Sequence, residues 1–254
     1  MQKQLLLILA AAGLFLVGCS STPDAEQKTE VESLTAQELT TKAKASLNSG
    51  NYTRAIELLE EIDTRYPFGK ISEQVKLDLI FAYFKKGEYD RGQTQADRFI
   101  RQHPQHNSLD YVYYMKGLMY YEQERGFIKD LLSADIHKRD TSNLKAAFSS
   151  FRSLVQVYPD SQYAPDARQR MIQVKNLLAQ HELHIAKFYM ERDSYVGAAN
   201  RAKYIVEAYP KATVVPQALE ILINSYKLLD IPELAEQYRR VLLLNYPNYS
   251  LNEF

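Results

Sequence analysis

The chain has 254 residues, with 31 basic and 31 acidic side chains, 19 Tyr, 10 Phe, no Trp and a single Cys. This balance excludes the basic excess typical of nucleic-acid-binding proteins, so no nucleic-acid partner is expected. One cysteine cannot form an intramolecular disulfide, so stability must come from packing, much of it through tyrosine rings. The length suffices for one large domain or an elongated array.

The N-terminus has the pattern of a secretion signal over residues 1–18. Lys3 supplies a positive charge, and Leu5 to Val17 form an apolar run that is too short to span a bilayer as a helix. The run ends in Leu16-Val17-Gly18-Cys19, the arrangement of a bacterial lipobox. An ordinary secreted protein with a buried cysteine is the alternative, but it would not explain why the apolar run, the small residues and the cysteine occur together.

Cys19 is therefore predicted to be the first mature residue and to carry an N-acyl group, such as palmitate, and an S-diacylglycerol group. Several acyl chains anchor a protein stably. Ser20 and Ser21 follow the cysteine where an inner-membrane lipoprotein usually has Asp, so we expect an outer-membrane anchor with the body facing the periplasm. Residues 19–35 are polar and acidic and are predicted to form a flexible lipid tether. Apart from this covalent lipid, no cofactor is expected.

From Ala36 onward a pattern recurs with the same phase in every copy. An aromatic residue or His precedes proline at Tyr66-Pro67, His103-Pro104, Tyr158-Pro159, Tyr209-Pro210 and Tyr246-Pro247. Five residues before each proline is an apolar residue: Ile62, Phe99, Leu154, Ile205 and Leu242. Twelve residues before it is a small one: Ala55, Gly92, Ala147, Ala198 and Ala235. Five residues earlier still is a turn or cap residue: Gly50, Gly87, Ser142, Asp193 and Asp230.

This pattern predicts a helical hairpin in each copy. Proline excludes the helical conformation from the residue before it and so ends the second helix, while the small residue lets the two helices approach. The spacing of 37 residues between Pro67 and Pro104, repeated between Pro210 and Pro247, is close to the 34-residue tetratricopeptide period. We expect an all-α fold, an α-solenoid of five tetratricopeptide-like hairpins; an irregular helical bundle is the alternative. The predicted helices are 36–48, 52–65, 72–86, 89–102, 108–123, 144–157, 163–191, 195–208, 215–229 and 232–245.

Two longer spacings interrupt the period. One places an insertion at residues 124–143, between the two helices of the third repeat. The other lengthens the first helix of repeat four to residues 163–191, which carries an unbroken three-four apolar spacing. We expect this helix to join N-terminal repeats 1–3 (residues 36–160) to C-terminal repeats 4–5 (residues 161–254).

Catalytic and metal-binding patterns are weak. His181-Glu182-Leu183-His184 lacks the four-residue offset that lets two histidines of an H-E-x-x-H motif face one metal, and His181 fits the buried stripe of its helix. Neither a nucleophile elbow nor a phosphate-binding loop is present. The sequence therefore predicts neither an enzyme nor a metal site.

Protein-docking surfaces remain as the predicted functional feature, because stacked hairpins line a groove with their first helices. Apolar side chains share one face of two such helices: Leu77, Phe81 and Phe84 in the second repeat, and Tyr111, Tyr114, Leu118 and Tyr121 in the third. Packing between repeats is an equally good interpretation for each residue alone.

Several segments resemble one known family. Arg65-Tyr66-Pro67-Phe68-Gly69, the stretch from Gln74 to Ile80, Asp97 to Arg101 and Asp110-Tyr111-Val112 are similar to the BamD family, also called ComL-type, of outer-membrane protein assembly lipoproteins. The similarity covers essentially the whole chain, but within Leu131 to Asp140 only Arg139-Asp140 match.

The resemblance implies a non-enzymatic, lipid-anchored scaffold of the outer-membrane β-barrel assembly machine (Bam complex). In such a scaffold the C-terminal repeats bind the POTRA domains of a BamA-like insertase, and BamC- and BamE-like lipoproteins attach. The N-terminal repeats receive unfolded outer-membrane proteins. Asn200 and Arg201 match the family's insertase contact, and Tyr66 and Phe68 are candidates for the N-terminal substrate face. Together with the helix-face residues Leu77, Phe81, Phe84, Tyr111, Tyr114 and Tyr121 they make up the candidate substrate groove.

Two other classes of function are alternatives for a helical-repeat protein. A periplasmic repeat lipoprotein that coordinates peptidoglycan or envelope-division partners usually adds a coiled-coil segment, and no long heptad run precedes the first repeat. A lytic transglycosylase would need a lysozyme-like domain, for which the sequence after the fifth repeat leaves no room.

Overall fold

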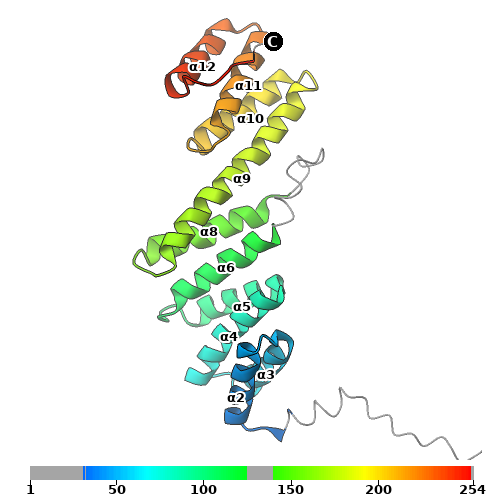
Figure 1. Ribbon diagram of the computed structural model, residues 1–254, viewed down its shortest axis with the longest axis vertical. Coiled ribbons are helices and arrows are strands. Elements are labelled where there is room, and N and C mark those ends of the chain that lie inside the picture. The colour runs from blue at the N-terminus through cyan, green and yellow to red at the C-terminus, as the bar shows by residue number, and fades with distance from the viewer. Residues whose placement is uncertain (1–30, 32, 125–139, 253–254) are drawn as a thin grey trace, which may run out of the picture. The chain divides into compact units, whose positions relative to one another are not determined.

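The computed structural model describes residues 31, 33–124 and 140–252 (Figure 1). The elements of this part of the chain are ten helices, and it contains no strand. Their bounds are α2 Ala36–Asn48, α3 Tyr52–Arg65, α4 Lys70–Lys86, α5 Tyr89–Gln102, α6 Leu109–Gln123, α8 Ser142–Val157, α9 Ala164–Met190, α10 Tyr195–Ala208, α11 Val215–Leu228 and α12 Pro232–Asn245. The predicted all-α class is confirmed. The predicted signal, Cys19 and most of the tether lie outside the described residues.

The helix bounds differ from the predicted ones by at most two residues. α4 begins at Lys70 because Gly69, at φ +89°, turns the chain and its carbonyl accepts a bond from the Glu73 N–H (3.2 Å). α8 begins at Ser142, whose N–H donates to the Asp140 carboxylate at 2.9 Å. α9 has 27 residues, about 40 Å at the usual helical rise.

The second helix of every hairpin ends in the same way. The residue before each marked proline has φ between −128° and −136° and ψ between 53° and 64°, and its N–H donates to the carbonyl four residues earlier. The apolar residue at that earlier position is fully buried in all five copies: Ile62, Phe99, Leu154, Ile205 and Leu242. Proline thus fixes the end of the helix, and the apolar side chain one turn back anchors it in the core.

The turns between paired helices follow the pattern with one exception. Four of the marked positions have a left-handed backbone, Gly50, Gly87, Asp193 and Asp230, with φ from +55° to +83°. Ser142 does not, because the insertion replaces the tight turn and Ser142 becomes the first residue of α8. Asp and Gly are among the residues that tolerate this conformation best.

The helices divide into two compact units, and the division falls inside α4, between Val75 and Lys76. In the first unit, α2 packs on α3. Thr35 and Glu38 form a reciprocal capping box at the start of α2, which satisfies backbone donors that the helix leaves unpaired. The Arg65 guanidinium donates to the carbonyl oxygens of Val31 and Leu34, each at 2.9 Å, and so ties the segment before α2 to the end of α3.

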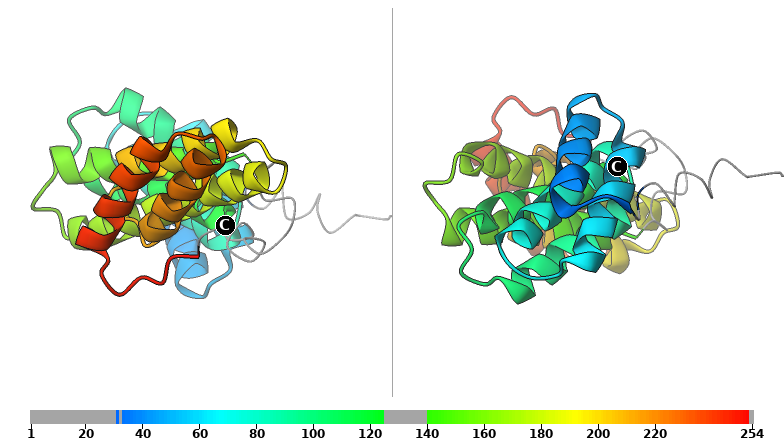
Figure 2. Two further views of the ribbon diagram at one scale, coloured as in Figure 1. Left: turned by 90° about the horizontal axis from the view of Figure 1, so that it is seen from above. Right: turned by 90° about the horizontal axis from the view of Figure 1, so that it is seen from below.

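In the second unit, consecutive helices from α5 to α12 pack side by side (Figures 1 and 2). Close approach depends on the small residues: a Cβ on Gly92 would lie 2.3 Å from the Met119 sulfur and 3.2 Å from the Tyr83 Cβ. A side chain at position 92 would therefore force these neighbours apart.

The core of the second unit forms two clusters that both draw on α9. Val174, Leu177 and Leu178 belong to a cluster with α4, α5, α6 and α8, whereas Leu183 and Ala186 belong to a cluster with α10, α11 and α12. One continuous helix thus supports both clusters. The division of the repeats at residue 160 stays a prediction. Among the described helices, none is long and apolar enough to cross a membrane.

Candidate docking site

Arg201 lies on the exposed face of α10, where the sequence predicts a contact. Its Nη1 donates to the Glu182 carboxylate of α9 at 3.1 Å, and the arginine side chain is 45% exposed while that of Glu182 is only 16% exposed. Asn200, the preceding residue, is exposed as well. The partly buried carboxylate therefore orients one edge of the guanidinium.

The Arg201 fork has donors left over for a partner. A guanidinium has five N–H donors arranged to bind carboxylates in pairs, and the described residues provide Arg201 with the single acceptor on Glu182. An arginine that is oriented but incompletely bonded can accept a second, external carboxylate without losing the internal one. The arrangement suits a protein-docking contact.

In the first unit, the two predicted substrate-face residues differ in exposure. Phe68 is 89% exposed, whereas Tyr66 is 39% exposed and caps the end of α3 through its backbone N–H. Ile71, the second residue of α4, is also exposed. Phe68 is thus the candidate whose ring is most available to a partner.

In the second unit, the predicted groove residues of α4 are mostly covered. Leu77 is buried in the core, and Phe81 and Phe84 are partly buried against it. Phe84 packs on Tyr89 with ring centroids 6.1 Å apart, and the Lys85 ammonium lies 5.9 Å from the Phe81 ring centre. These side chains hold α4 in place, and only the edges of the two phenylalanines reach the surface.

The three predicted tyrosines of α6 pack against α9 or the turn before it. Tyr114 stacks on Tyr163 at 4.8 Å, and its hydroxyl donates to Asp166 at 2.8 Å. Tyr111 also lies against Tyr163, and the Arg170 guanidinium lies 5.6 Å from the Tyr121 ring.

Burial raises the pKa of Tyr111 well above its usual range, and the charges of Tyr163 and Asp78 add to the effect. The pKa of Tyr114 is raised by burial first and by its bond to Asp166 second. Both shifts are in the direction expected of hydroxyls that are packed against other side chains.

Sequence reasoning missed the carboxylates that orient these residues. Glu182 was considered only as part of a degenerate metal motif, and Asp166 was not singled out. Their partners are 19 and 52 residues away in the chain, so no local spacing could reveal the pairs. No local signal marks Glu182, because the polar residues Gln180, His181 and His184 surround it in α9.

The histidines of that motif do not form a metal site. His181 is buried, and the pKa of His184 is lowered by burial first and then by Lys187 and His181. Across residues 31, 33–124 and 140–252, no group of three His, Cys, Asp or Glu side chains is placed to hold a metal ion.

Comparison with known proteins gives the family. The model of the YfiO family, described as an outer membrane lipoprotein, matches residues 32–242. The chain belongs to this family of outer membrane lipoproteins.

Relatives of this YfiO-family chain are similar over their whole length. The "Outer membrane protein assembly factor BamD" of Vibrio cholerae is 40% identical over 245 residues, which cover 96% of this chain and 99% of the relative. The protein of the same name from Neisseria gonorrhoeae is 37% identical over 243 residues, 95% of this chain and 91% of the relative. Both are named as assembly factors.

Among solved structures, "MamA 41-end from Desulfovibrio magneticus RS-1" is 15% identical, covers 85% of this chain and 97% of its own, and has a TM-score of 0.37. Neither fold nor function is inferred from a likeness at this level.

Proposed function

We propose that the chain is a lipid-anchored, non-enzymatic scaffold of the outer-membrane β-barrel assembly machine. The observation that supports this function is the similarity, from end to end, to proteins named as outer membrane protein assembly factors. An assembly factor acts by positioning other proteins, and the exposed, oriented Arg201 is a contact suited to that role.

The partners we propose are those that the family resemblance implies. The C-terminal repeats, with Arg201 and Asn200, bind the POTRA domains of a BamA-like insertase, and BamC- and BamE-like lipoproteins attach to the scaffold. Unfolded outer-membrane proteins bind the N-terminal repeats. Phe68 and Tyr66 are the exposed candidates for that contact, and the edges of Phe81, Phe84, Tyr111, Tyr114 and Tyr121 are secondary ones.

The mechanism is positional. The lipid on Cys19 holds the scaffold at the membrane surface, and a second weak contact then forms within a tethered pair. Tethering of this kind raises the effective concentration of the two surfaces to about the millimolar range. A modest contact at Arg201 therefore suffices for a stable complex, and a substrate held by the N-terminal repeats stays near the insertase.

The docking contact is tested by charge reversal at Arg201. Arg201→Glu is expected to reduce co-purification of the insertase at least tenfold, because it removes a cation and adds a charge that repels an acidic partner. Arg240→Glu, which reverses another exposed arginine on α12, serves as the matched control and should leave recovery unchanged.

A swapped pair separates docking from folding. Arg201→Glu combined with Glu182→Arg restores an internal ion pair in which the two charges have exchanged positions. Insertase recovery should stay low in this double variant. Restored recovery would mean that the first variant failed through a broken internal pair, and the contact would be wrong.

The anchor is tested by Cys19→Ser. This variant is expected to leave a soluble periplasmic form, because the serine hydroxyl is not a substrate for thioether formation. The measurement is membrane fractionation in detergent-free extracts with mass spectrometry of the mature N-terminus. Retention in the membrane fraction at high salt would contradict the lipid anchor.

A further inference from the structure

A second surface feature lies along α8, α9 and α10. Two adjoining hollows of about 730 and 260 Å³ share Lys175 and Tyr209 and so form one continuous groove, which we name the basic groove. Its walls are formed by α8, α9, α10 and the turn after α10. All of these elements belong to the second unit.

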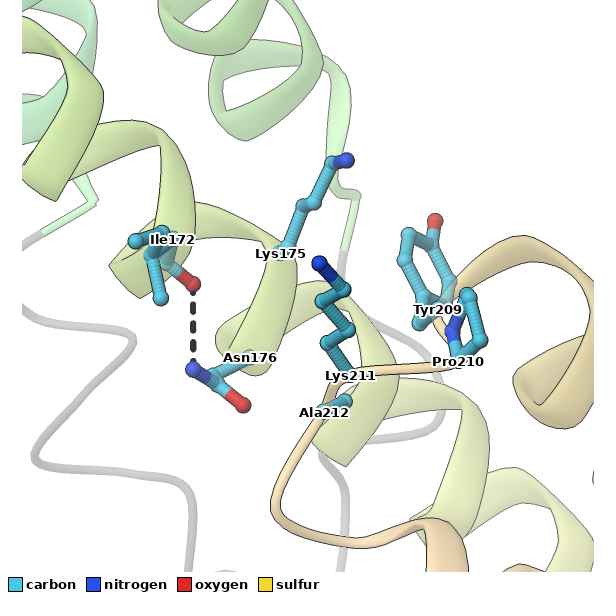
Figure 3. A pocket seen from close by; sticks show the side chains of 7 residues that line it. All are labelled: Ile172, Lys175, Asn176, Tyr209, Pro210, Lys211 and Ala212. Carbon is cyan, nitrogen blue, oxygen red and sulfur yellow. Dashed lines mark hydrogen bonds between the residues drawn. The ribbon is translucent and has the colours of Figure 1, made fainter.

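The lining of the basic groove carries positive charge and no carboxylate. Lys145 and Arg152 come from α8, Lys175 from α9 and Lys211 from the turn after α10, and all four are exposed. Within the described part of the chain, none of them forms an ion pair. The Arg152 Nε donates a hydrogen bond to the Gln156 side-chain oxygen at 3.3 Å. Figure 3 shows the side chains of Lys175 and Lys211 extending in the same direction, beside the Tyr209 ring.

Acidic residues near the groove do not neutralise it. Glu182 lies close enough to Tyr209 to help raise its pKa, after burial and the bond of the Tyr209 hydroxyl to Tyr204, but this carboxylate is held by Arg201. Asp140 is near Lys145, which contributes to the lowered pKa of that aspartate after the two bonds from Ser142. The described lining itself holds four cations and no carboxylate, and an anion in the groove would relieve the repulsion between these cations.

Apolar side chains lie beneath the cations. Phe148 and Val155 share one face of α8 with Lys145 and Arg152, at spacings of three and four residues, and Met171 and Leu178 do the same around Lys175 on α9. The Lys175 ammonium lies 5.3 Å from the Phe148 ring centre. Tyr204, 45% exposed, packs edge-on against Tyr209 at 5.7 Å. The groove thus has an apolar, aromatic floor and a cationic rim.

We infer that the basic groove is a docking site for an extended segment of a partner protein in which carboxylates alternate with apolar or aromatic residues. Successive side chains of an extended chain point to opposite sides, so carboxylates can reach the lysine rim while apolar side chains contact the floor. The charge complementarity selects acidic segments, and the aromatic floor supplies the contact area. This interaction surface shares no lining residue with the Arg201 contact of the proposed function.

The alternating pattern argues against an anionic lipid. A lipid carries its charge at one end and its apolar chains at the other, whereas cations and apolar side chains alternate along each wall of the groove. A small anion would use the cations and leave the floor uncovered.

The test uses the full mature chain purified in detergent and a fluorescein-labelled octapeptide in which Asp alternates with Leu or Phe. Two control peptides replace every Asp by Lys, or every Leu and Phe by Ser. Fluorescence anisotropy should show binding of the first peptide and at least tenfold weaker binding of both controls. Lys175→Glu with Lys211→Glu should weaken binding at least tenfold, and Tyr204→Ala about threefold or more.

Lys44→Glu with Lys70→Glu is the matched variant, because both lysines are exposed and lie on α2 and α4 outside the groove. It should bind the peptide as the unmodified chain does, and circular dichroism should show the same helix content in all variants. Equal weakening by both double variants, or equal binding of the serine control peptide, would overturn the inference. So would absent peptide binding together with Lys175- and Lys211-dependent binding to phosphatidylglycerol nanodiscs, which would assign the groove to lipid.

Discussion

Two arginine–carboxylate pairs on α9 and its neighbours have the same chemistry but different surroundings. The Arg170 guanidinium lies 2.5 Å from Asp166, whose carboxylate also accepts the Tyr114 hydroxyl, and it covers the Tyr121 ring. Arg201 has one bond, 3.1 Å long, to Glu182. The Arg170 side chain is 25% exposed and that of Arg201 is 45% exposed.

The comparison separates a structural arginine from a docking arginine. Arg170 uses its charge, its donors and its flat face within the fold, so little is left for a partner. Arg201 is oriented by one carboxylate, and the other described residues give its remaining donors no acceptor. The number of internal contacts, rather than the residue type, distinguishes the two roles.

The largest effect on stability is expected for a buried aromatic residue that packs against Tyr114. Phe151 is fully buried beneath Tyr114, and Phe151→Ala is expected to lower the free energy of unfolding by about 3–5 kcal/mol through lost contacts and a cavity. Urea unfolding followed by circular dichroism measures the change. Phe68→Ala, at an exposed ring, is the matched control and should cost no more than about 0.5 kcal/mol. Equal losses would remove the distinction between packed and available aromatics.

The second-largest effect is the difference in stability between variants of the two arginines. Arg170→Gln is expected to lower the free energy of unfolding by about 1–2 kcal/mol, because it removes a charge-assisted hydrogen bond and a cation–aromatic contact. Arg201→Gln should change it by no more than about 0.5 kcal/mol, since an exposed ion pair contributes little. Denaturant midpoints of the two variants decide the point. A larger loss for Arg201→Gln would show that it, too, is structural.

The smallest effect is a pH dependence of the packed tyrosine face. The raised pKa of Tyr111 means that the folded chain keeps this proton above pH 10, where the unfolded chain loses it. Its contribution is therefore fully present below about pH 10 and is lost as the pH rises further, by about 1 kcal/mol at pH 11. Tyr111→Phe should reduce the alkaline loss of stability by that amount, measured by urea unfolding at pH 8 and pH 11. An unchanged slope would contradict the assigned burial.

Much of the fold could be predicted from the sequence because its signals are local. Proline and the residue before it end each second helix, and the buried apolar residue five positions earlier recurs in every copy. Gly50 and Asp193 likewise mark turns through their own backbone preference. Ser142 was not a turn residue, because a long insertion removes the constraint that a tight turn imposes.

The candidate site could be predicted only in part. The sequence indicated an apolar face on α6, but whether a tyrosine there faces a partner or α9 depends on helices that lie far apart in sequence. The Tyr114 hydroxyl can donate to Asp166 because α9 packs beyond α6 in the fold. Arg201 can donate to Glu182 because the turn between α9 and α10 brings the two helices together. The basic groove was missed for the same reason, since its cations come from positions 145 to 211.

The uniform ending of the second helices has a consequence for how such chains change over evolution. Because each hairpin closes on its own proline and its own buried anchor, additional residues between the paired helices do not disturb the phase of later copies. α6 and α8 still pack together although the chain between them is much longer than in the other hairpins. That junction is therefore a natural place to graft a reporter peptide or an epitope tag, with the remaining hairpins left intact.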